Sequence, residues 1–212
     1  MRRFLLLLAA LLLLPSFAAA QEHPVNNTKI VPPHAVALLE MLREGGLVIY
    51  FRHGSTPDYS EPSIADFSDC PRQRNLNPLG RAQSALIGDD FKALKIPVGS
   101  VIASPFCRCM DTARIAFGTV TAADEVRGMK ASPQMRAHFT TPQKPGANLV
   151  IVGHGSASGL IGEEFLREAE AVVVKPLGED KYELVARIRA EQWAQFRPEN
   201  REPPPGAPRA QQ

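Results

Sequence analysis

The chain has 212 residues, with 24 Lys and Arg against 22 Asp and Glu and a formal net charge of +2. Because no block of basic residues stands out from this balance, composition gives no electrostatic basis for binding nucleic acid. The length suits a single domain with a sizeable core. A small-molecule or surface-glycan partner remains open.

The first twenty residues predict export. Arg2 and Arg3 precede an apolar run from Phe4 to Leu14, and the small residues Ala18 to Ala20 follow. A basic start, a short apolar stretch and an A-x-A ending are typical of a secretory signal peptide, cleaved here before Gln21. The run is shorter than the roughly 20 residues that span a bilayer, so we expect no stable membrane span after cleavage. The expected location is therefore the periplasm or the outside of the cell.

Proline content separates the two ends of the mature chain from its middle. Residues 21–33 are polar and contain three prolines, and residues 198–212 contain five. Such segments favour extended, weakly packed chain. We therefore expect a signal peptide over 1–20, a flexible lead over 21–33, one folded domain over 34–197 and a Pro-rich tail over 198–212.

The first half of the domain shows a helix, a strand and a second helix. Apolar residues at helical spacing over 35–42 predict a helix that Gly45 and Gly46 end. Residues 47–51 form a short apolar run, as in a strand buried on both faces. Asn77 followed by Pro78 predicts the start of a long helix. Its expected buried stripe consists of Leu79, Ala82, Leu86 and Ala93.

The second half continues the alternation. We expect strands over 98–103 and 149–152, with a helix over 108–117 following the first of them. Residues 170–175 and 181–189 predict a final pair of strands, with a helix near Trp193. Alternation of this kind indicates an α/β fold, a three-layer α/β/α sandwich with a mostly parallel central sheet.

Polar motifs follow three of the predicted strands. Arg52-His53-Gly54 closes the strand over 47–51, a segment from Ser104 to Arg108 follows the second, and Gly153-His154-Gly155 follows the third. In open α/β sheets, ligands bind in the crevice at the carboxyl ends of the strands. We therefore expect two His and two Arg side chains to meet in one cleft.

These motifs resemble those of the histidine phosphatase superfamily, which includes the phosphoglycerate mutases. The resemblance covers roughly residues 45–155 and is carried by Arg52-His53-Gly54, by Ser104-Pro105 with Arg108, and by the late His154. The segments 73–76, 80–81, 112–113 and 117–118 are similar to those of small exported or uncharacterised bacterial members. The resemblance implies a histidine-phosphatase-like fold.

The chemistry of phosphoryl transfer assigns roles to these residues. A neutral imidazole can attack phosphorus without a separate base, so His53 is expected to form a phosphohistidine. Guanidinium forks bind phosphoryl oxygens in bidentate fashion, which suits Arg52 and Arg108. His154, expected to be protonated, would add a third donor. We expect no metal and no other cofactor. Arg108 could instead be a solvated residue at a helix start.

The resemblance also implies contacts around this centre. Thr56 falls where many members present a polar side chain to substrate, although a turn hydroxyl that caps its own backbone is an equal alternative. Arg74 and Asn75 are weaker candidates. His23, His34 and His138 have no motif context and are expected to be non-catalytic.

The general acid is not evident in the sequence. Acid phosphatases of the superfamily follow their second His with an acid, and mutases place a Glu between the two halves. Here Gly155 follows His154. Asp124 and Glu125 are the best substitutes, and the identity of the acid stays open.

Three cysteines in an exported chain suggest one disulfide and one unpaired thiol. Cys70 lies in the long loop after the first motif, and Cys107 adjoins Arg108, so both should approach the cleft. We predict a disulfide between Cys70 and Cys107, with Cys109 buried as a small apolar residue.

The sequence thus predicts a metal-independent phosphomonoester hydrolase of the cell envelope that acts through a phosphohistidine on His53. Its substrate would be a small-molecule or surface-glycan phosphomonoester, with lipopolysaccharide core phosphates as one example by family analogy. The alternatives are a phosphomutase of the same superfamily and a catalytically silent module that binds a phospho-ligand, because a fold does not fix a function.

Overall fold

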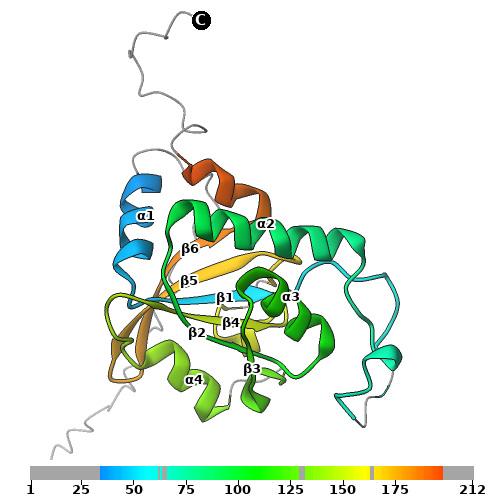
Figure 1. Cartoon of the computed structure of the whole chain (residues 1–212). Coiled ribbons are helices and arrows are strands. Elements are labelled where there is room, and N and C mark those ends of the chain that lie inside the picture. The colour runs from blue at the N-terminus through cyan, green and yellow to red at the C-terminus, as the bar shows by residue number, and fades with distance from the viewer. Residues whose placement is uncertain (1–33, 62, 64–65, 129–131, 163–164, 198–212) are drawn as a thin grey trace, which may run out of the picture.

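A computed structural model describes residues 34–61, 63, 66–128, 132–162 and 165–197 (Figure 1). The predicted signal peptide over 1–20, the lead over 21–33 and the tail over 198–212 lie outside the described residues. None of the helices in the described part of the chain is long and apolar enough to cross a membrane.

A six-stranded sheet in the order β3-β2-β4-β1-β5-β6 forms the centre of the molecule. Strand β1 pairs in parallel with β4 and antiparallel with β5, and β4, β2 and β3 continue the parallel part. The strands are β1 (Val48–Arg52), β2 (Val98–Ala103), β3 (Thr121–Ala122), β4 (Asn148–Gly153), β5 (Ala171–Gly178) and β6 (Lys181–Ile188). The predicted α/β class with a mostly parallel sheet core is confirmed.

Helices cover both faces of the sheet, as in a three-layer sandwich (Figure 1). One face packs against α1 (His34–Glu44), α2 (Pro78–Leu94), α3 (Cys107–Phe117) and the 3-10 helix η4 (Ala190–Phe196). The other packs against α4 (Pro133–Thr140) and the 3-10 helices η2 (Asp124–Val126) and η3 (Ala157–Gly159). Side chains alternate between the two layers along β1, with Ile49 and Phe51 on the first and Val48 and Tyr50 on the second.

Most of the predicted helices form where expected, but the buried stripe predicted for α2 is wrong. Asn77 caps the helix as predicted, its side chain accepting a hydrogen bond from the Gly80 amide at 2.8 Å. However, the four predicted core positions, Leu79, Ala82, Leu86 and Ala93, are all exposed. The buried positions are instead Gly80, Ser84, Ile87, Gly88, Asp90, Phe91 and Leu94.

Close backbone packing explains this error. A Cβ atom at Gly88 would collide with the carbonyl oxygen of Ala116 in α3, and one at Gly80 with the carbonyl oxygen of Ser55. Helix α2 therefore uses its small residues to approach α3 and the loop that follows β1. A prediction based only on large apolar residues therefore assigns the wrong face of α2 to the core.

Several short elements were not predicted. Strand β3, helix α4 and the 3-10 helices η1 (Cys70–Arg72), η2 and η3 have no clear periodicity in the sequence, and the expected helix near Trp193 is the 3-10 helix η4. In α4, Met135 and Phe139 are four residues apart and fully buried against the sheet. Helix α4 thus contributes two large buried side chains to the second layer.

Candidate active site

The predicted motifs converge at one edge of the sheet. His53 follows β1, Ser104 follows β2 and His154 follows β4, and these three strands are neighbours with the same direction. The His53 amide donates to the Gly153 carbonyl at 3.0 Å, and the Ser104 amide to the Val152 carbonyl at 2.9 Å. The ring centroids of His53 and His154 lie 5.8 Å apart. The sheet therefore brings the two predicted histidines face to edge in one site.

The tautomer of His53 is fixed by its own chain. Nδ1 lies 2.8 Å from the carbonyl oxygen of Gly54, which can only accept, so Nδ1 carries the proton and Nε2 keeps its lone pair. His53 is 2% exposed. Burial, together with the charges of Arg108 and Arg52 and the ring of His154, lowers the pKa of His53 to about 2. The imidazole is therefore neutral at physiological pH, as a nucleophile requires.

His154 is held through its backbone and through its ring. The Tyr50 hydroxyl accepts a hydrogen bond from the His154 amide at 2.8 Å and donates to the His154 carbonyl at 3.0 Å. Nε2 of His154 lies 3.0 Å from Oγ of Ser104. Burial and the charges of Arg108, Arg52 and Arg74 lower the pKa of His154 to about 3. The expectation of a protonated His154 is therefore wrong for the ligand-free protein.

These two lowered pKa values predict how stability depends on pH. Below the usual histidine pKa of about 6.5, the unfolded chain binds protons at His53 and His154 that the folded chain does not. The free energy of unfolding should therefore fall as the pH drops from 6.5 towards 3, by up to about 1.4 kcal/mol per pH unit for each histidine. Urea unfolding at successive pH values measures this slope.

A matched variant isolates one histidine in that measurement. His154→Gln removes one of the two groups, so its slope below pH 6 should be shallower by up to about 1.4 kcal/mol per pH unit. Carboxylates that also titrate in acid are common to both proteins and cancel in the comparison. Equal slopes would mean that His154 is protonated in the folded protein, against the pKa given above.

Arg108 and Arg52 reach the site from different elements. Arg108, in the first turn of α3, is 5% exposed, lies over the Phe106 ring at 4.4 Å and forms an ion pair with Glu61. A solvated helix-start residue would not be buried in this way, so that alternative is wrong. Arg52, at the end of β1, is only half-buried and donates to the Leu166 carbonyl at 2.9 Å.

Arg74 joins these two arginines. It contributes to the lowered pKa of His154, and its Nε lies 3.9 Å from Glu61. Arg52, Arg74 and Arg108 each keep a buried Nε atom that has no hydrogen-bond partner among the described residues. Buried donors are normally paired, because an unpaired one costs about 1–3 kcal/mol. A bound anion with several acceptor oxygens would supply the missing partners.

Two carboxylates that the sequence did not reveal complete the cluster. Glu61 contacts Arg108, and Glu168 lies 3.6 Å from Arg52. Thr56 is buried and donates from Oγ1 to Glu168 at 2.8 Å, so its hydroxyl has a side-chain partner at the site. Both glutamates lie in loops without periodicity, where no motif marks them. Asn75 braces the loop instead, donating to the Cys70 carbonyl at 2.6 Å.

The two acids expected from the sequence have other partners. Asp124 is exposed and lies 3.8 Å from Arg127. Glu125 accepts from Nε2 of His138 at 2.9 Å, and this hydrogen bond lowers the pKa of the Glu125 carboxyl. Glu125 is therefore paired with His138 of α4 rather than with the arginines around the two histidines. His34 begins α1, and His23 lies outside the described residues.

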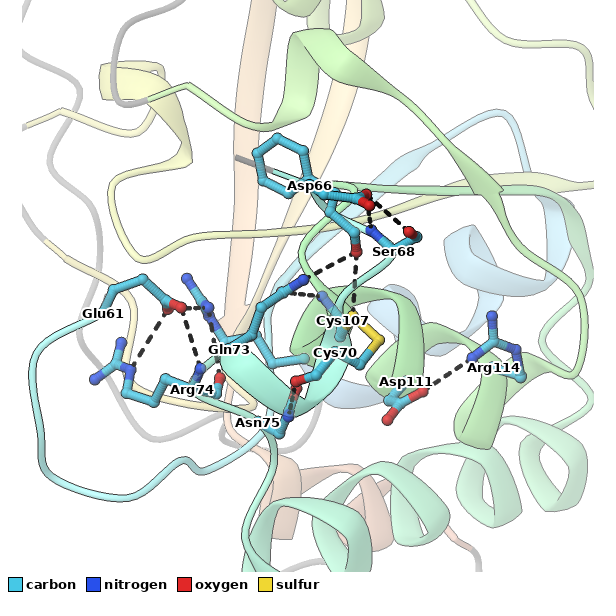
Figure 2. The surroundings of a disulfide bond; sticks show 12 residues. Glu61, Asp66, Ser68, Cys70, Gln73, Arg74, Asn75, Cys107, Asp111 and Arg114 are labelled. Carbon is cyan, nitrogen blue, oxygen red and sulfur yellow. Dashed lines mark hydrogen bonds and ion pairs between the residues drawn. A yellow bond between two sulfur atoms is a disulfide. The ribbon is translucent and has the colours of Figure 1, made fainter. Parts of the chain in front are cut away.

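The predicted disulfide is present between Cys70 and Cys107 (Figure 2). Cys109 is buried and forms no disulfide. Gln73 strengthens the link, since its Oε1 accepts from the Cys107 amide at 2.9 Å. The bridge spans 37 residues and ties the loop after β1 to the first turn of α3. A loop of that length corresponds to about 4 kcal/mol in the chain-entropy estimate. It also fixes the backbone that carries Arg108.

Comparison with known proteins agrees with this arrangement. Residues 48–130 match the model of the histidine phosphatase superfamily (branch 1). No protein of curated function matches the sequence. Among the described residues, no group of three or more His, Cys, Asp or Glu side chains could hold a metal ion.

Similar solved structures are distant in sequence. SixA from Agrobacterium tumefaciens is 20% identical over 68% of this chain and 97% of its own, with a TM-score of 0.49. YhfR from Bacillus stearothermophilus is 14% identical over 66% and 95%, with a TM-score of 0.45. Phosphoserine phosphatase from Entamoeba histolytica, solved as a mutant with phosphoserine, is 12% identical over 69% and 98%, with a TM-score of 0.47.

The family match includes the first two of the three motifs that meet at the sheet edge, those of His53 and Arg108. The third, with His154, follows the neighbouring strand β4 and completes the cluster. Residues 48–130 are therefore similar to the histidine phosphatase superfamily (branch 1), and the His154 segment lies beside them in the sheet.

Proposed function

We propose that the protein is a phosphomonoester hydrolase that forms a transient phosphohistidine on His53. One observation carries the proposal: a buried, neutral imidazole lies among arginines whose buried Nε donors have no hydrogen-bond acceptor within the described part of the chain. A phosphoryl group offers both an electrophile for the imidazole and oxygens for the guanidinium groups.

The residues divide the reaction between them. Nε2 of His53 attacks phosphorus, and the P–O bond to the leaving group breaks in line with that attack. Arg52, Arg74 and Arg108 bind the remaining phosphoryl oxygens, whose charge persists through the transition state. Water then attacks the phosphohistidine, which releases inorganic phosphate and returns His53 to its neutral form.

His154 has a proton-dependent role in this scheme. Its ring is neutral in the ligand-free site because burial and nearby arginines depress its pKa. A phosphoryl dianion would offset those positive charges and favour the protonated imidazole. His154 would then donate to a phosphoryl oxygen, so that protonation follows substrate binding.

The setting of the enzyme is also part of the proposal. The signal-like sequence of residues 1–20 supports export to the cell envelope, where the Cys70–Cys107 bridge would persist. Cationic side chains supply the charge that a metal would otherwise provide, so we propose metal-independent hydrolysis. The substrate would be a small-molecule or surface-glycan phosphomonoester.

Activity of the purified mature protein tests this function. We expect it to hydrolyse nitrophenyl phosphate and at least one sugar or alkyl phosphate, with rates unchanged by a chelator. Tight phosphate binding without turnover would identify a silent binding module. Transfer of the phosphoryl group to another position of the substrate would identify a mutase, and loss of activity with the chelator would contradict metal independence.

A further inference from the structure

Glu61 lies in the loop between β1 and α2, eight positions after the proposed nucleophile in the sequence. Its Oε2 forms an ion pair with Nη1 of Arg108, and its Oε1 accepts from the Arg74 amide at 3.1 Å. Figure 2 shows the carboxylate beside Arg74, in the loop that the Cys70–Cys107 disulfide ties to α3. Glu61 is thus held against two of the three arginines with unpaired donors.

Arg108 links Glu61 to the reacting centre. Among the neighbouring charges, Arg108 contributes more than Arg52 to the lowered pKa of both His53 and His154. The Phe106 ring lies between Arg108 and His154, since the Arg108 guanidinium is 4.4 Å from its centroid and the His154 ring centroid is 5.3 Å from it. A phosphoryl group between the rings would contact Arg108, and the Glu61 carboxylate would then lie beside that phosphoryl group.

The other acids considered are less well placed to protonate the leaving group. Glu168 is engaged by the Thr56 hydroxyl at 2.8 Å and lies on the Arg52 flank. Glu125 is paired with His138 of α4. Among the described residues, Glu61 is the one of these three acids that contacts the buried Arg108.

We propose that Glu61 is the catalytic residue that protonates the leaving-group oxygen, an inference that rests on the proposed function. As the P–O bond breaks and the P–Nε2 bond forms, the proton of the Glu61 carboxyl passes to the departing oxygen, which leaves as an alcohol. The resulting carboxylate then takes a proton from the water that attacks the phosphohistidine. Hydrolysis thus returns Glu61 to its protonated form and balances the cycle.

Substrate binding changes the charges that face Glu61, which takes the proton for this role from solvent. In the ligand-free site, Arg108 and Arg74 face the Glu61 carboxylate, and the two nearby imidazoles are neutral. A phosphoryl dianion takes over the arginine contacts and adds negative charge next to Glu61. Both changes weaken the hold of the two arginines on the Glu61 side chain. The ion pair seen without ligand is therefore compatible with a general acid in the enzyme–substrate complex.

Leaving-group dependence tests Glu61 directly. A positioned acid contributes about 10²–10⁴-fold in rate when the leaving group is poor, as with an alkyl phosphate. We expect Glu61→Gln to slow hydrolysis of 2-glycerophosphate by about that factor and of 4-nitrophenyl phosphate by less than about 10-fold. Glu125→Gln, which removes a carboxylate bound to His138 instead, should leave the ratio of the two rates unchanged.

Equal losses on both esters would overturn the proposal, since Glu61 would then only position Arg108. A plot of rate against leaving-group pKa for the wild-type enzyme gives a test that needs no variant. A shallow dependence supports an acid, and a steep one overturns it. If the wild-type enzyme forms no phosphohistidine on His53, the proposed function itself fails, whereas labelling of His53 with equal losses in Glu61→Gln overturns only the role of Glu61.

Discussion

Replacing His53 with Ala should abolish turnover and remove the phosphoryl label while leaving the fold intact. The side chain supplies Nε2, for which the site offers no neutral substitute in the same position, and loss of a nucleophile typically costs about 10⁴-fold or more. The backbone contacts of residue 53, to the Gly153 carbonyl and from the Ala169 amide, do not depend on the side chain. Acid-labile phosphate mapped by mass spectrometry after a brief incubation with substrate locates the intermediate.

A matched control is available in His138. It is a histidine of α4 that is paired with Glu125, so His138→Ala should retain both labelling and turnover. Circular dichroism and thermal unfolding of the two variants separate loss of chemistry from loss of structure. Label on another residue, or substantial turnover by His53→Ala, would contradict the phosphohistidine mechanism.

The centre of the site was predictable because its information is local. Arg52-His53-Gly54, the segment around Arg108, and His154 each follow a strand that its apolar run reveals. Parallel neighbours end at the same edge of a sheet, so three motifs in three such strands must meet. For the motifs to meet, β1 had to pair with β4 and β4 with β2. The structure shows both parallel pairs.

The protonation state of His154 could not be predicted from the residues next to it in the sequence. Its neutral state follows from burial and from three arginines that three separate segments bring together. A sequence shows the residue type, whereas the pKa depends on the charges packed around it. The prediction of the buried face of α2 was wrong for a related reason. The buried face of that helix depends on the segments that Gly80 and Gly88 approach, and these are distant in the sequence.

The carboxylates of the site were hidden by sequence distance. Glu61 lies 47 residues from Arg108, and Glu168 lies 112 residues from Thr56. Both stand in loops between regular elements, where neither helical nor strand periodicity constrains the position of a side chain. The predicted disulfide gave one indication of this arrangement. Because Cys107 adjoins Arg108, pairing it with Cys70 implied that the loop after β1 turns back towards Arg108.

Replacing Arg108 with Ala should lower kcat/KM by about 10²–10³-fold or more, the range found when one preorganised donor to developing charge is removed. Arg108 is 5% exposed and acts on both histidine rings, so its loss removes a guanidinium from the centre of the phosphoryl site. The same change raises the pKa of His53 and His154 towards their ordinary value. Inhibition by inorganic phosphate should weaken in parallel, and both effects are measured by steady-state kinetics.

Two further variants test which property of Arg108 matters. One keeps its charge without the guanidinium geometry, and the other removes a different arginine from the same helix. Arg108→Lys keeps a positive charge but loses bidentate geometry, so it should recover only part of the activity. Arg114→Ala removes an exposed arginine of the same helix, paired with Asp111, and should leave kcat/KM unchanged. Full activity in Arg108→Lys would show that charge alone suffices. A loss below about 10-fold in Arg108→Ala, well short of the effect of a preorganised donor, would instead place Arg108 outside the phosphoryl site and leave its burial with Glu61 as a structural ion pair.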